Sequence, residues 1–366
     1  MRVSKKKVLV LFGGQSSEHQ ISCATAAGVL QAIDRQKWDV LPVGITLEGE
    51  WVLMPDDPSL YGLQEGGGYT VPRLATRVHV ETGSPAVSIT KPGEETQFHE
   101  IDVVFPLLHG PWGEDGTLQG LLEMSHIRYV GCGVAASAVA MDKYLTKAVL
   151  SQADIEVGAW EYVSPREWKT NRPAVLERLR HLGFPAFVKP CRAGSSMGIT
   201  RVSSFGELEG AIEAAQAHDP RVLVEAANPG REIECGVLGL AGGQTVAAPL
   251  GEIQVVDSKW YDYETKYFNP DGVSLRCPAE IPADISDAIR NTALRAFEVL
   301  ELEGLSRIDF FFDEATGSFA INEVNTLPGF TPFSMYPTML AKAGFDYPSL
   351  VQALLEEAMS RPVGLR

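Results

Sequence analysis

The chain has 366 residues, which is too long for one compact core and predicts two or three domains. Hydrophobic residues make up 45% and charged residues 21%, a composition that excludes collagenous, coiled-coil and disordered proteins. The net charge of -16 argues against a nucleic-acid partner, although a few converging lysines and backbone N–H groups can still bind a phosphate in a cleft.

The five cysteines are scattered and show neither Cys-x-x-Cys nor Cys/His ligand spacing, which fits a reducing compartment. The apolar run Val8 to Phe12 is too short for a signal peptide. No run approaches the roughly 20 apolar residues that a membrane helix needs. We therefore expect a cytoplasmic protein that has no membrane partner.

The first part of the chain predicts an α/β unit. A buried strand at Val8 to Phe12 is followed by Gly13-Gly14 and by helical spacing of apolar residues from Ile21 to Ile33. A second strand at Ile101 to Phe105 and a helix from Leu118 to Met124 repeat this order. About 130 residues are thus expected to form an α/β domain.

Within the first domain, residues from about 48 to 99, rich in Gly, Pro and Thr, predict only strands and loops.

The middle of the chain predicts a second unit. One helix is expected from Val134 to Ser151, a strand at Ala186 to Lys189, a helix near Phe205 to Ala217 and a strand at Val222 to Glu225. No internal repeat is visible.

A β-hairpin is predicted over residues 307–325, where two alternating strands flank a short connection with a glycine. If Asp309 lies opposite Glu323, then Arg307 faces Asn325 on the same side. Two opposed carboxylates repel each other unless a cation lies between them, and such oxygen ligands suit Mg²⁺. The alternative is a solvated face on which Arg307 pairs with Asp309.

Two glycine-rich loops follow predicted strands. Residues 189–198 offer glycines, hydroxyls and successive N–H groups that can cover a phosphate, without the Walker A ending. Residues 13–18 lack the dinucleotide fingerprint, which disfavours a nicotinamide enzyme. There, Ser17 and Gln20 have the spacing of a capping box, and the functional alternative is that Glu18 captures an ammonium group. A plain turn is the alternative for either loop.

Three lysines lie beside glycine-rich or aromatic clusters: Lys143, Lys189 and Lys266. A magnesium-bound triphosphate needs several such charges, whereas any one lysine alone is usually solvated. The aromatic, charged segment 261–267 predicts either a lid over a reacting centre or a surface loop. His109 lies between a predicted strand and helix, where α/β domains carry sites, but a lone histidine is commonly structural.

Seven motifs occur in the order found in D-alanine–D-alanine ligases, and the chain resembles that family. The resemblance covers about 8 to 26, 101 to 145, 184 to 203, 221 to 268 and 305 to 340. The motifs are Gly-Gly-x-Ser-x-Glu18, His109-Gly-x-x-Gly-Glu-Asp-Gly, Met141-Asp-Lys143, Lys189-Pro-x-x-x-Gly-Ser195-Ser, Tyr-Asp-Tyr-Glu-x-Lys266-Tyr267, Arg307-x-Asp309 and Asn322-Glu323-Val-Asn325-Thr-x-Pro-Gly329.

The resemblance implies a three-domain ATP-grasp fold of α/β and α+β domains. A Rossmann-like N-terminal domain at 1–131 would carry the first D-alanine site. A central ATP-grasp domain at 132–223 would carry the Gly/Ser loop. A C-terminal ATP-grasp domain at 224–366 would carry the metal ions, the lid and the second D-alanine site.

The same resemblance implies site residues. ATP would contact Lys143, Lys189, Ser195, Ser196, Glu225, Ala227, Glu232, Lys266, Asn322 and Glu323. Two Mg²⁺ or Mn²⁺ ions would be bound by Asp309, Glu323 and Asn325, with K⁺ as a further activator. The substrate residues would be Glu18 and His109 for the first D-alanine, Arg307 and the Gly329 N–H for the oxyanion, and Ser334 and the Met335 N–H for the second D-alanine. Glu18, Ser195 and Tyr267 would form a triad that closes the lid.

The reaction implied is ATP-dependent ligation of two D-alanines through an acyl phosphate, for peptidoglycan precursor synthesis, by a homodimer. The segment Glu225-Ala226-Ala227 lacks the basic or aromatic side chains often found at this adenine hinge, and Met335 stands where leucine is common. One alternative is a D-alanine–D-lactate or D-serine ligase, and Tyr267 favours an amine over D-lactate. Another is a non-catalytic ATP-binding sensor, which would not need the whole set of charged residues.

Overall fold

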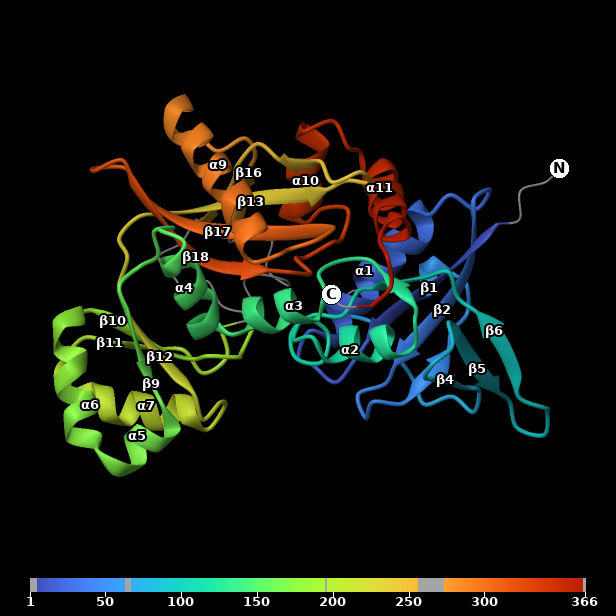
Figure 1. Ribbon diagram of the computed structural model, residues 1–366, viewed down its shortest axis with the longest axis horizontal. Coiled ribbons are helices and arrows are strands. Elements are labelled where there is room, and N and C mark those ends of the chain that lie inside the picture. The colour runs from blue at the N-terminus through green and yellow to red at the C-terminus, as the bar shows by residue number, and fades with distance from the viewer. Residues whose placement is uncertain (1–4, 63–66, 195, 256–272, 365–366) are drawn as a thin grey trace.

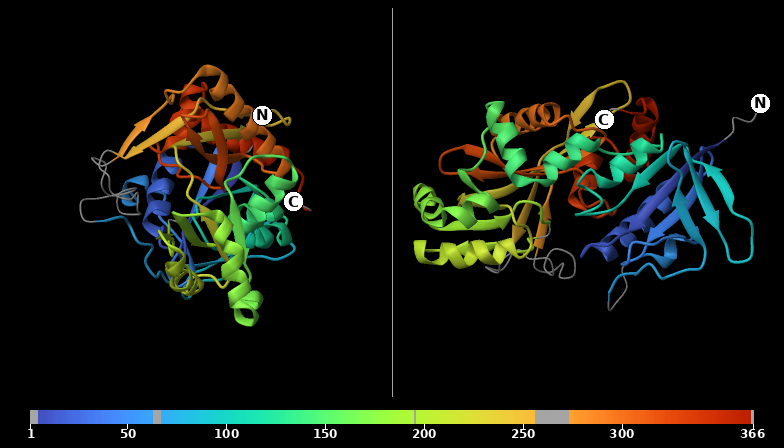
Figure 2. Two further views of the ribbon diagram at one scale, coloured as in Figure 1. Left: turned by 90° about the vertical axis from the view of Figure 1, so that its left-hand side faces the viewer. Right: turned by 60° about the horizontal axis from the view of Figure 1, so that its bottom comes forward.

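The computed structural model describes residues 5–62, 67–194, 196–255 and 273–364, and it describes the backbone alone at 254, 255 and 273. These residues form three β-sheets of eight, four and six strands, each covered by helices (Figure 1). The second view in Figure 2 shows the N-terminal and four-stranded parts at opposite ends, with the six-stranded part between them. The expected mixed α/β architecture is confirmed. No helix among the described residues is long and apolar enough to cross a bilayer.

The N-terminal sheet has the strand order β6-β5-β4-β3-β2-β1-β7-β8. Strands β2, β1, β7 and β8 are parallel. Strands β3 to β6 add an antiparallel extension, which lies in the segment for which the sequence predicted only strands and loops. The elements are β1 Lys6–Gly13, α1 His19–Ala32, β2 Trp38–Ile45, β3 Trp51–Leu53, η1 Pro58–Leu60, β4 Arg77–Val80, β5 Ala86–Thr90, β6 Gln97–Glu100, β7 Val103–Pro106, α2 Thr117–Met124 and β8 Arg128–Tyr129.

The four-stranded sheet is antiparallel, in the order β11-β10-β12-β9, and its helices pack on its apolar side chains. The predicted strands at 186–189 and 222–225 are confirmed as β10 and β12. The elements are β9 Trp160–Val163, α5 Pro165–Thr170, α6 Arg172–Leu179, η2 Arg180–Leu182, β10 Ala186–Pro190, β11 Thr200–Val202, η3 Phe205–Glu207, α7 Leu208–Gln216 and β12 Val222–Ala226.

The six-stranded sheet is antiparallel in the order β16-β15-β13-β17-β18, with β14 also paired to β13. Helices α9 and α10 both pack against β13. The elements are β13 Arg231–Gly239, β14 Thr245–Ala247, β15 Gly251–Val255, β16 Val273–Arg276, α9 Ala283–Val299, β17 Leu305–Asp313, β18 Ser318–Asn325, α10 Met335–Lys342 and α11 Tyr347–Ser360.

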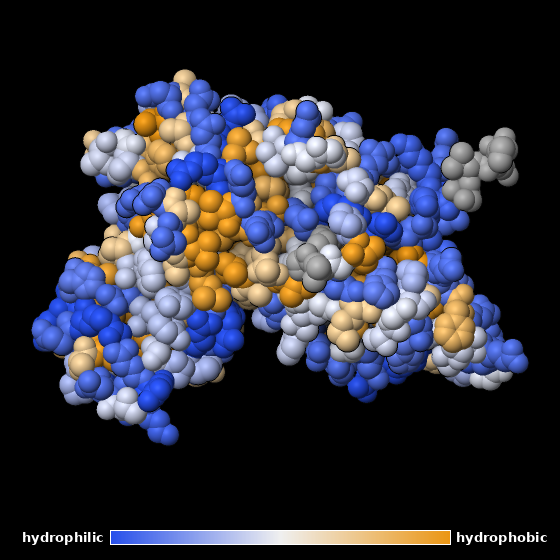
Figure 3. Space-filling view, in the orientation of Figure 1, coloured by the Kyte–Doolittle hydropathy of each residue, from blue (hydrophilic) through white to orange (hydrophobic). Residues whose placement is uncertain are grey.

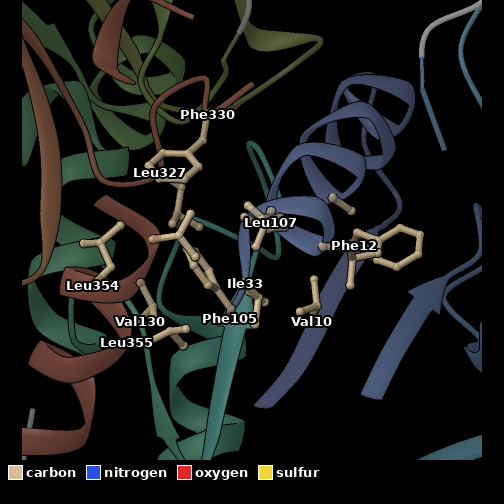
Figure 4. Close-up of a cluster of buried hydrophobic side chains, with 14 of the residues drawn as sticks. Val10, Phe12, Ile33, Phe105, Leu107, Val130, Leu327, Phe330, Leu354 and Leu355 are labelled. Carbon is tan, nitrogen blue, oxygen red and sulfur yellow. The ribbon is translucent and has the colours of Figure 1, made fainter. Parts of the chain in front are cut away.

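The last helix joins the two ends of the chain. Helix α11 packs against α1, β7 and β8 of the N-terminal sheet (Figure 1). Leu354 and Leu355 of α11 share one buried cluster with Val10 and Phe105 (Figure 4). Burial of this apolar surface stabilises the contact between the N-terminal and C-terminal parts. Figure 3 shows a gap between the two lower lobes of the molecule, which are the four-stranded part at the left and the N-terminal part at the right.

The single helix expected from Val134 to Ser151 is wrong, because the structure has two helices, α3 Val134–Met141 and α4 Lys143–Gln152. Asp142 between them is extended, with φ -96° and ψ 103°, and caps α4 by accepting the N–H groups of Tyr144 and Leu145. Asp142 also forms a buried ion pair with Arg221. The apolar spacing continues through the break, so the periodicity alone could not reveal it.

Candidate active site

The predicted hairpin and its register are confirmed. Strands β17 and β18 are antiparallel, Asp309 lies opposite Glu323, and Arg307 lies opposite Asn325. The register shifts between Asp309 and Phe310, so that Asn322 is the extra residue of a bulge. Polar side chains from two strands therefore share one face of the sheet, as the alternation predicted.

A third strand extends this row of acids. Glu234 on β13 lies opposite Asp309 on the other side of β17. Three carboxylates, Glu234, Asp309 and Glu323, thus stand in register across three neighbouring strands. Like charges directly opposite each other in a sheet are destabilising, so this row requires positive charge nearby. Glu234 was not among the residues predicted from the sequence, although its spacing of two from Glu232 places both side chains on one face of β13.

Arg307 supplies positive charge to this row. Its Nε lies 2.7 Å from Asp309 Oδ1 and 3.2 Å from Glu234 Oε1, and its Nη2 lies 2.7 Å from Asp309 Oδ2. Burial lowers the pKa of Arg307, but the charges of Asp309, Glu234 and Glu323 outweigh it and hold the pKa well above its usual value. The alternative pairing of Arg307 with Asp309 is therefore present in this structure.

The same residues have the donor chemistry for a divalent cation. Asp309 and Glu323 offer carboxylate oxygens and Asn325 offers an amide oxygen, which are the hard ligands that Mg²⁺ prefers. Asn325 Nδ2 donates to Asp309 Oδ2 at 2.9 Å. In the described parts of the chain, no three His, Cys, Asp or Glu side chains converge on one metal position. A cation here would rely on two carboxylates and the amide, and would compete with Arg307 for Asp309.

A buried charge cluster links α4 to the four-stranded sheet. Glu225 on β12 accepts from Lys147 Nζ at 2.7 Å through Oε1 and from Lys189 Nζ through Oε2. Burial raises the pKa of Glu225, but the two lysines outweigh it and lower the pKa to about 2. Burial lowers the pKa of Lys189, but the charge of Glu225 outweighs this effect and raises the pKa, so the cluster keeps Lys189 charged. Sequence analysis missed Lys147, although it follows Lys143 at the i,i+4 spacing of one helix face.

Lys143 is tied to the start of the Gly/Ser loop. Its Nζ donates to the Ala193 carbonyl at 2.8 Å and its backbone N–H donates to the Cys191 carbonyl at 3.0 Å. Glu232 and Glu323 both act electrostatically on Lys189, which brings the two sheets to one site. Ser196 belongs to this loop and has a left-handed backbone, φ 57°. Ser195, Lys266 and Tyr267 lie outside the described residues.

The first glycine loop differs from the capping-box interpretation, which is wrong. Helix α1 begins at His19 with Glu18 as its N-cap and without a side-chain capping bond. The Glu18 N–H donates to Ser16 Oγ at 3.2 Å, and Gln20 Oε1 accepts from the Gly68 N–H at 3.1 Å. The Gln20 side chain binds the backbone of a distant loop instead of the helix start, and Glu18 is the N-cap residue.

The Glu18 carboxylate lies between two loops. An added Cβ would stand 3.5 Å from Glu18 Oε2 at Gly110 and 3.8 Å from it at Gly194. Glu18 from the N-terminal domain is therefore next to the Gly/Ser loop, where an ammonium group could bridge them. Its side chain is 9% exposed, so its charge acts in a poorly solvated environment.

Two N-terminal residues hold the backbone of Leu327. His109 Nδ1 lies 3.0 Å from the Leu327 carbonyl, and Glu114 Oε1 accepts the Leu327 N–H at 2.9 Å. Glu114 Oε2 also accepts the Gly110 N–H at 2.8 Å. The Leu327 side chain packs in the buried cluster of Figure 4. Both peptide groups of Leu327 are thus fixed two residues before Gly329, and sequence analysis missed Glu114.

Burial raises the pKa of Glu114 to about 7, and the charge of Glu18 adds to this effect. A raised pKa means that the folded state binds a proton that the unfolded state releases above about pH 4.5. Stability from protonated Glu114 is therefore present at low pH and is lost as the pH rises towards 7. We expect the advantage in unfolding free energy of the wild type over Glu114→Gln to shrink by on the order of 3 kcal/mol between pH 4.5 and pH 8.

Urea unfolding of both proteins at pH 4.5, 6 and 8 measures this difference in unfolding free energy. The contributions of the titratable groups that both proteins share largely cancel in the difference. An advantage of the wild type that grows as the pH rises would contradict the prediction.

The segment after Leu327 brings the remaining predicted residues together. An added Cβ at Gly329 would lie 3.3 Å from Ser334 Oγ. Ser334 Oγ accepts the Thr331 N–H at 3.1 Å. Ser334 is the N-cap residue of α10, which begins at Met335, and its side chain makes no capping bond. Met335 packs so closely on Gly251 that an added Cβ there would be 2.5 Å from its sulfur. Gly329, Ser334 and the Met335 N–H are therefore adjacent.

Comparison with known families covers most of the chain. The family model described as D-ala D-ala ligase N-terminus matches residues 7–132, and the one described as D-ala D-ala ligase C-terminus matches residues 149–356. A D-alanine–D-alanine ligase of Kineococcus radiotolerans is 50% identical over 99% of each chain. One of Mycobacterium ulcerans is 45% identical over 100% of this chain and 98% of its own.

Two solved structures have the same fold. The D-alanine–D-alanine ligase from Coxiella burnetii gives a TM-score of 0.82 at 33% identity, covering 98% of this chain and 95% of that one. The VanG D-Ala:D-Ser ligase from Enterococcus faecalis gives a TM-score of 0.81 at 33% identity, covering 97% and 100%.

Proposed function

Because the chain belongs to the D-alanine–D-alanine ligase family, we propose that it joins two D-alanines into D-alanyl-D-alanine, a peptidoglycan precursor, while ATP becomes ADP and phosphate. The observation that supports this most strongly is the register of the hairpin, which sets Asp309 opposite Glu323 with Arg307 beside them. The expected ATP-grasp fold agrees with the solved relatives.

ATP is proposed to bind between the four-stranded and six-stranded sheets. Both oxygens of Glu225 accept from lysines, so its main role would be to hold Lys189 in place for the phosphates. Adenine would then rely mostly on backbone groups near Ala227. The proposed contacts are Lys143, Lys189, Ser195, Ser196, Glu225, Ala227, Glu232, Lys266, Asn322 and Glu323.

The reaction would proceed in two displacements. A carboxylate oxygen of the first D-alanine attacks the γ-phosphorus, and the bond from this phosphorus to the bridging oxygen of ADP breaks, which gives an acyl phosphate. The amine of the second D-alanine, after losing a proton, attacks the acyl carbon. The carbon–oxygen bond to phosphate then breaks and the amine nitrogen loses its remaining extra proton. Catalysis would be mostly positioning and charge stabilisation.

Two Mg²⁺ or Mn²⁺ ions would be held by Asp309, Glu323 and Asn325. When bound, such ions neutralise the charge of the triphosphate during phosphoryl transfer. The oxygen donors and the repulsion within the row of acids support this assignment. K⁺ is proposed as an additional activator by resemblance.

The protein's own groups would orient the two D-alanines. Glu18 would hold the first ammonium group, with His109 nearby. Arg307 and the Gly329 N–H would stabilise the negative charge that develops on the acyl oxygen. The clamp on Leu327 supports the position of Gly329.

Two further assignments follow from the family. Ser334 and the Met335 N–H would bind the second carboxylate, since they lie at the start of a helix. Glu18, Ser195 and Tyr267 would close the site as a triad. The domain limits 1–131, 132–223 and 224–366, a homodimer and a cytoplasmic location remain predictions.

The test is to mix the protein with ATP, Mg²⁺ and D-alanine and to measure ADP. We expect ADP to form only when D-alanine is present. A non-catalytic ATP-binding sensor would bind ATP but form no ADP with D-alanine or with any other amino acid. That silence, from a folded protein, would overturn the proposed function.

Substitution of Lys147 is expected to weaken ATP binding. In Lys147→Met, Lys189 is the one cation left to Glu225 among the described residues, so we expect the pair to shift away from the phosphate position. The KM for ATP should rise about 10-fold, or about 1.4 kcal/mol, while the KM for D-alanine changes little. Steady-state ADP release measures both. Lys169→Met, an exposed lysine of α5, is the control. An unchanged KM for ATP in a folded Lys147→Met protein would contradict this role.

A further inference from the structure

Glu234 belongs to the active-site face but not to the predicted hairpin. It lies on β13, directly opposite Asp309, and is 3% exposed. Its Oε1 lies 3.2 Å from Arg307 Nε. A carboxylate is costly to bury without a positive partner, so the Arg307 contact accounts for its charge.

The two acids that contact Arg307, Asp309 and Glu234, differ in their proposed roles. Asp309 forms a bidentate pair with Arg307 at 2.7 Å for both bonds, and it is also a proposed metal ligand. The Asp309 carboxylate has about four lone-pair sites and already accepts two bonds from Arg307 and one from Asn325 Nδ2 at 2.9 Å, so coordination of a cation would weaken its bonds to Arg307. When Asp309 turns to the cation, a buried guanidinium with no other acid would lose its fixed position.

We propose that Glu234 is a positioning residue for the ligation reaction, which retains Arg307 at the acyl oxygen while Asp309 binds the divalent cation. This inference rests on the proposed function, because it assumes those roles for Arg307 and Asp309. In this role Glu234 is neither a metal ligand nor a group that touches the reacting atoms. It acts through the guanidinium, as outer partners of metal sites commonly do.

A second buried pair of an acid and an arginine on the same sheet serves as a comparison for Glu234 and Arg307. Glu252 on β15 is also 3% exposed and binds Arg231 through two bonds of 2.7 and 2.8 Å. Glu252 lies opposite Ile233, so it faces the other side of the sheet from Glu234. Arg231 contacts Glu252, the Glu280 carbonyl and Glu314, none of which is a proposed metal ligand, so we expect the Glu252 pair to contribute to stability.

The experiment compares Glu234→Gln with Glu252→Gln in the full chain. In Glu234→Gln, Asp309 is the acid left in contact with Arg307, which then holds Asp309 against the cation. We expect kcat to fall about 10- to 100-fold and the Kd for Mn²⁺ with ADP to rise by a similar factor, with the KM for ATP within threefold. Electron paramagnetic resonance of free Mn²⁺ measures the Kd without turnover.

Glu252→Gln is expected to lower thermal stability but to leave kcat and the Mn²⁺ Kd within twofold of the wild type. If Glu234→Gln does not fold, Glu234→Asp replaces it and should give smaller shifts in the same direction. Unchanged kcat and Mn²⁺ Kd in either folded Glu234 variant, or equal shifts in Glu252→Gln, would overturn the inference. A wild type that forms no dipeptide would instead overturn the proposed function, whereas the Mn²⁺ titration reports on Glu234 in either case.

Discussion

Replacing Glu323 with glutamine is expected to lower kcat about 10³-fold, which corresponds to about 4 kcal/mol of lost transition-state stabilisation. The side chain keeps its shape but loses the charge that a divalent cation needs. Glu323 is a sharper target than Asp309, because Asp309 is also bonded to Arg307 and its loss would disturb two functions. Steady-state ADP release at saturating ATP, D-alanine and Mg²⁺ measures the effect.

Glu314→Gln is the matched control for this experiment. Glu314 lies in the connection of the same hairpin, its side chain is 73% exposed, and no role at the site is expected. It should leave kcat within twofold. A Glu323→Gln protein with kcat within tenfold of the wild type would contradict a metal site at this hairpin.

Arg307→Lys is expected to lower kcat about 10²- to 10³-fold, as loss of an oxyanion donor usually does. Lysine keeps a positive charge beside Asp309 and Glu234, so the acids stay paired, but it cannot reproduce the planar fork of the guanidinium. The KM for ATP should change little, because Arg307 is not among the proposed ATP contacts. Kinetics with D-alanine, together with a thermal unfolding curve, measure both effects.

Arg231→Lys provides the comparison, since Arg231 binds Glu252 on the same sheet away from the site. It is expected to lower stability without a comparable loss of kcat. If Arg307→Lys kept kcat within threefold of the wild type, stabilisation of the acyl oxygen by Arg307 would have to be abandoned.

The hairpin was predictable from the sequence because all of its information is local. The connection from 313 to 318 is short, and the alternation along β17 keeps Phe310 and Phe312 buried, whereas the bulge at Asn322 that sets Asp309 opposite Glu323 could not be predicted. A shift of one residue would have turned these aromatic rings out of the core. The metal-site prediction followed from that register.

Residues whose roles depend on distant partners escaped prediction. Glu234 is recognised only when β13 pairs with β17, Lys147 only when α4 reaches Glu225, and Glu114 only when its loop meets Leu327. Each partner lies 70 or more residues away in the chain, so spacing along the sequence carried no signal of the contact. Asp142 likewise breaks a periodic helix through Arg221.

Several of the ordered motifs contain residues that the structure brings together. Glu18 lies beside Gly194, Lys143 holds the Ala193 carbonyl, and the Gly329 and Ser334 segment meets the N-terminal domain through Leu327. The acidic net charge is compatible with positive groups at the site, because Lys147, Lys189 and Arg307 are each paired with buried acids. The sequence could not reveal the pairing of Glu225 with Lys147 or of Glu234 with Arg307, because each requires elements far apart in the chain to pack together.

The most direct test of the account is to identify the product formed from an equimolar mixture of D-alanine, D-serine and D-lactate with ATP and Mg²⁺. Mass spectrometry of the products, together with the ADP formed, gives the identity of the second substrate and the stoichiometry. We predict D-alanyl-D-alanine as the main product, with one ADP for each dipeptide. A main product of D-alanyl-D-serine or D-alanyl-D-lactate, or ADP without any ligated product, would contradict the assignment as a D-alanine–D-alanine ligase.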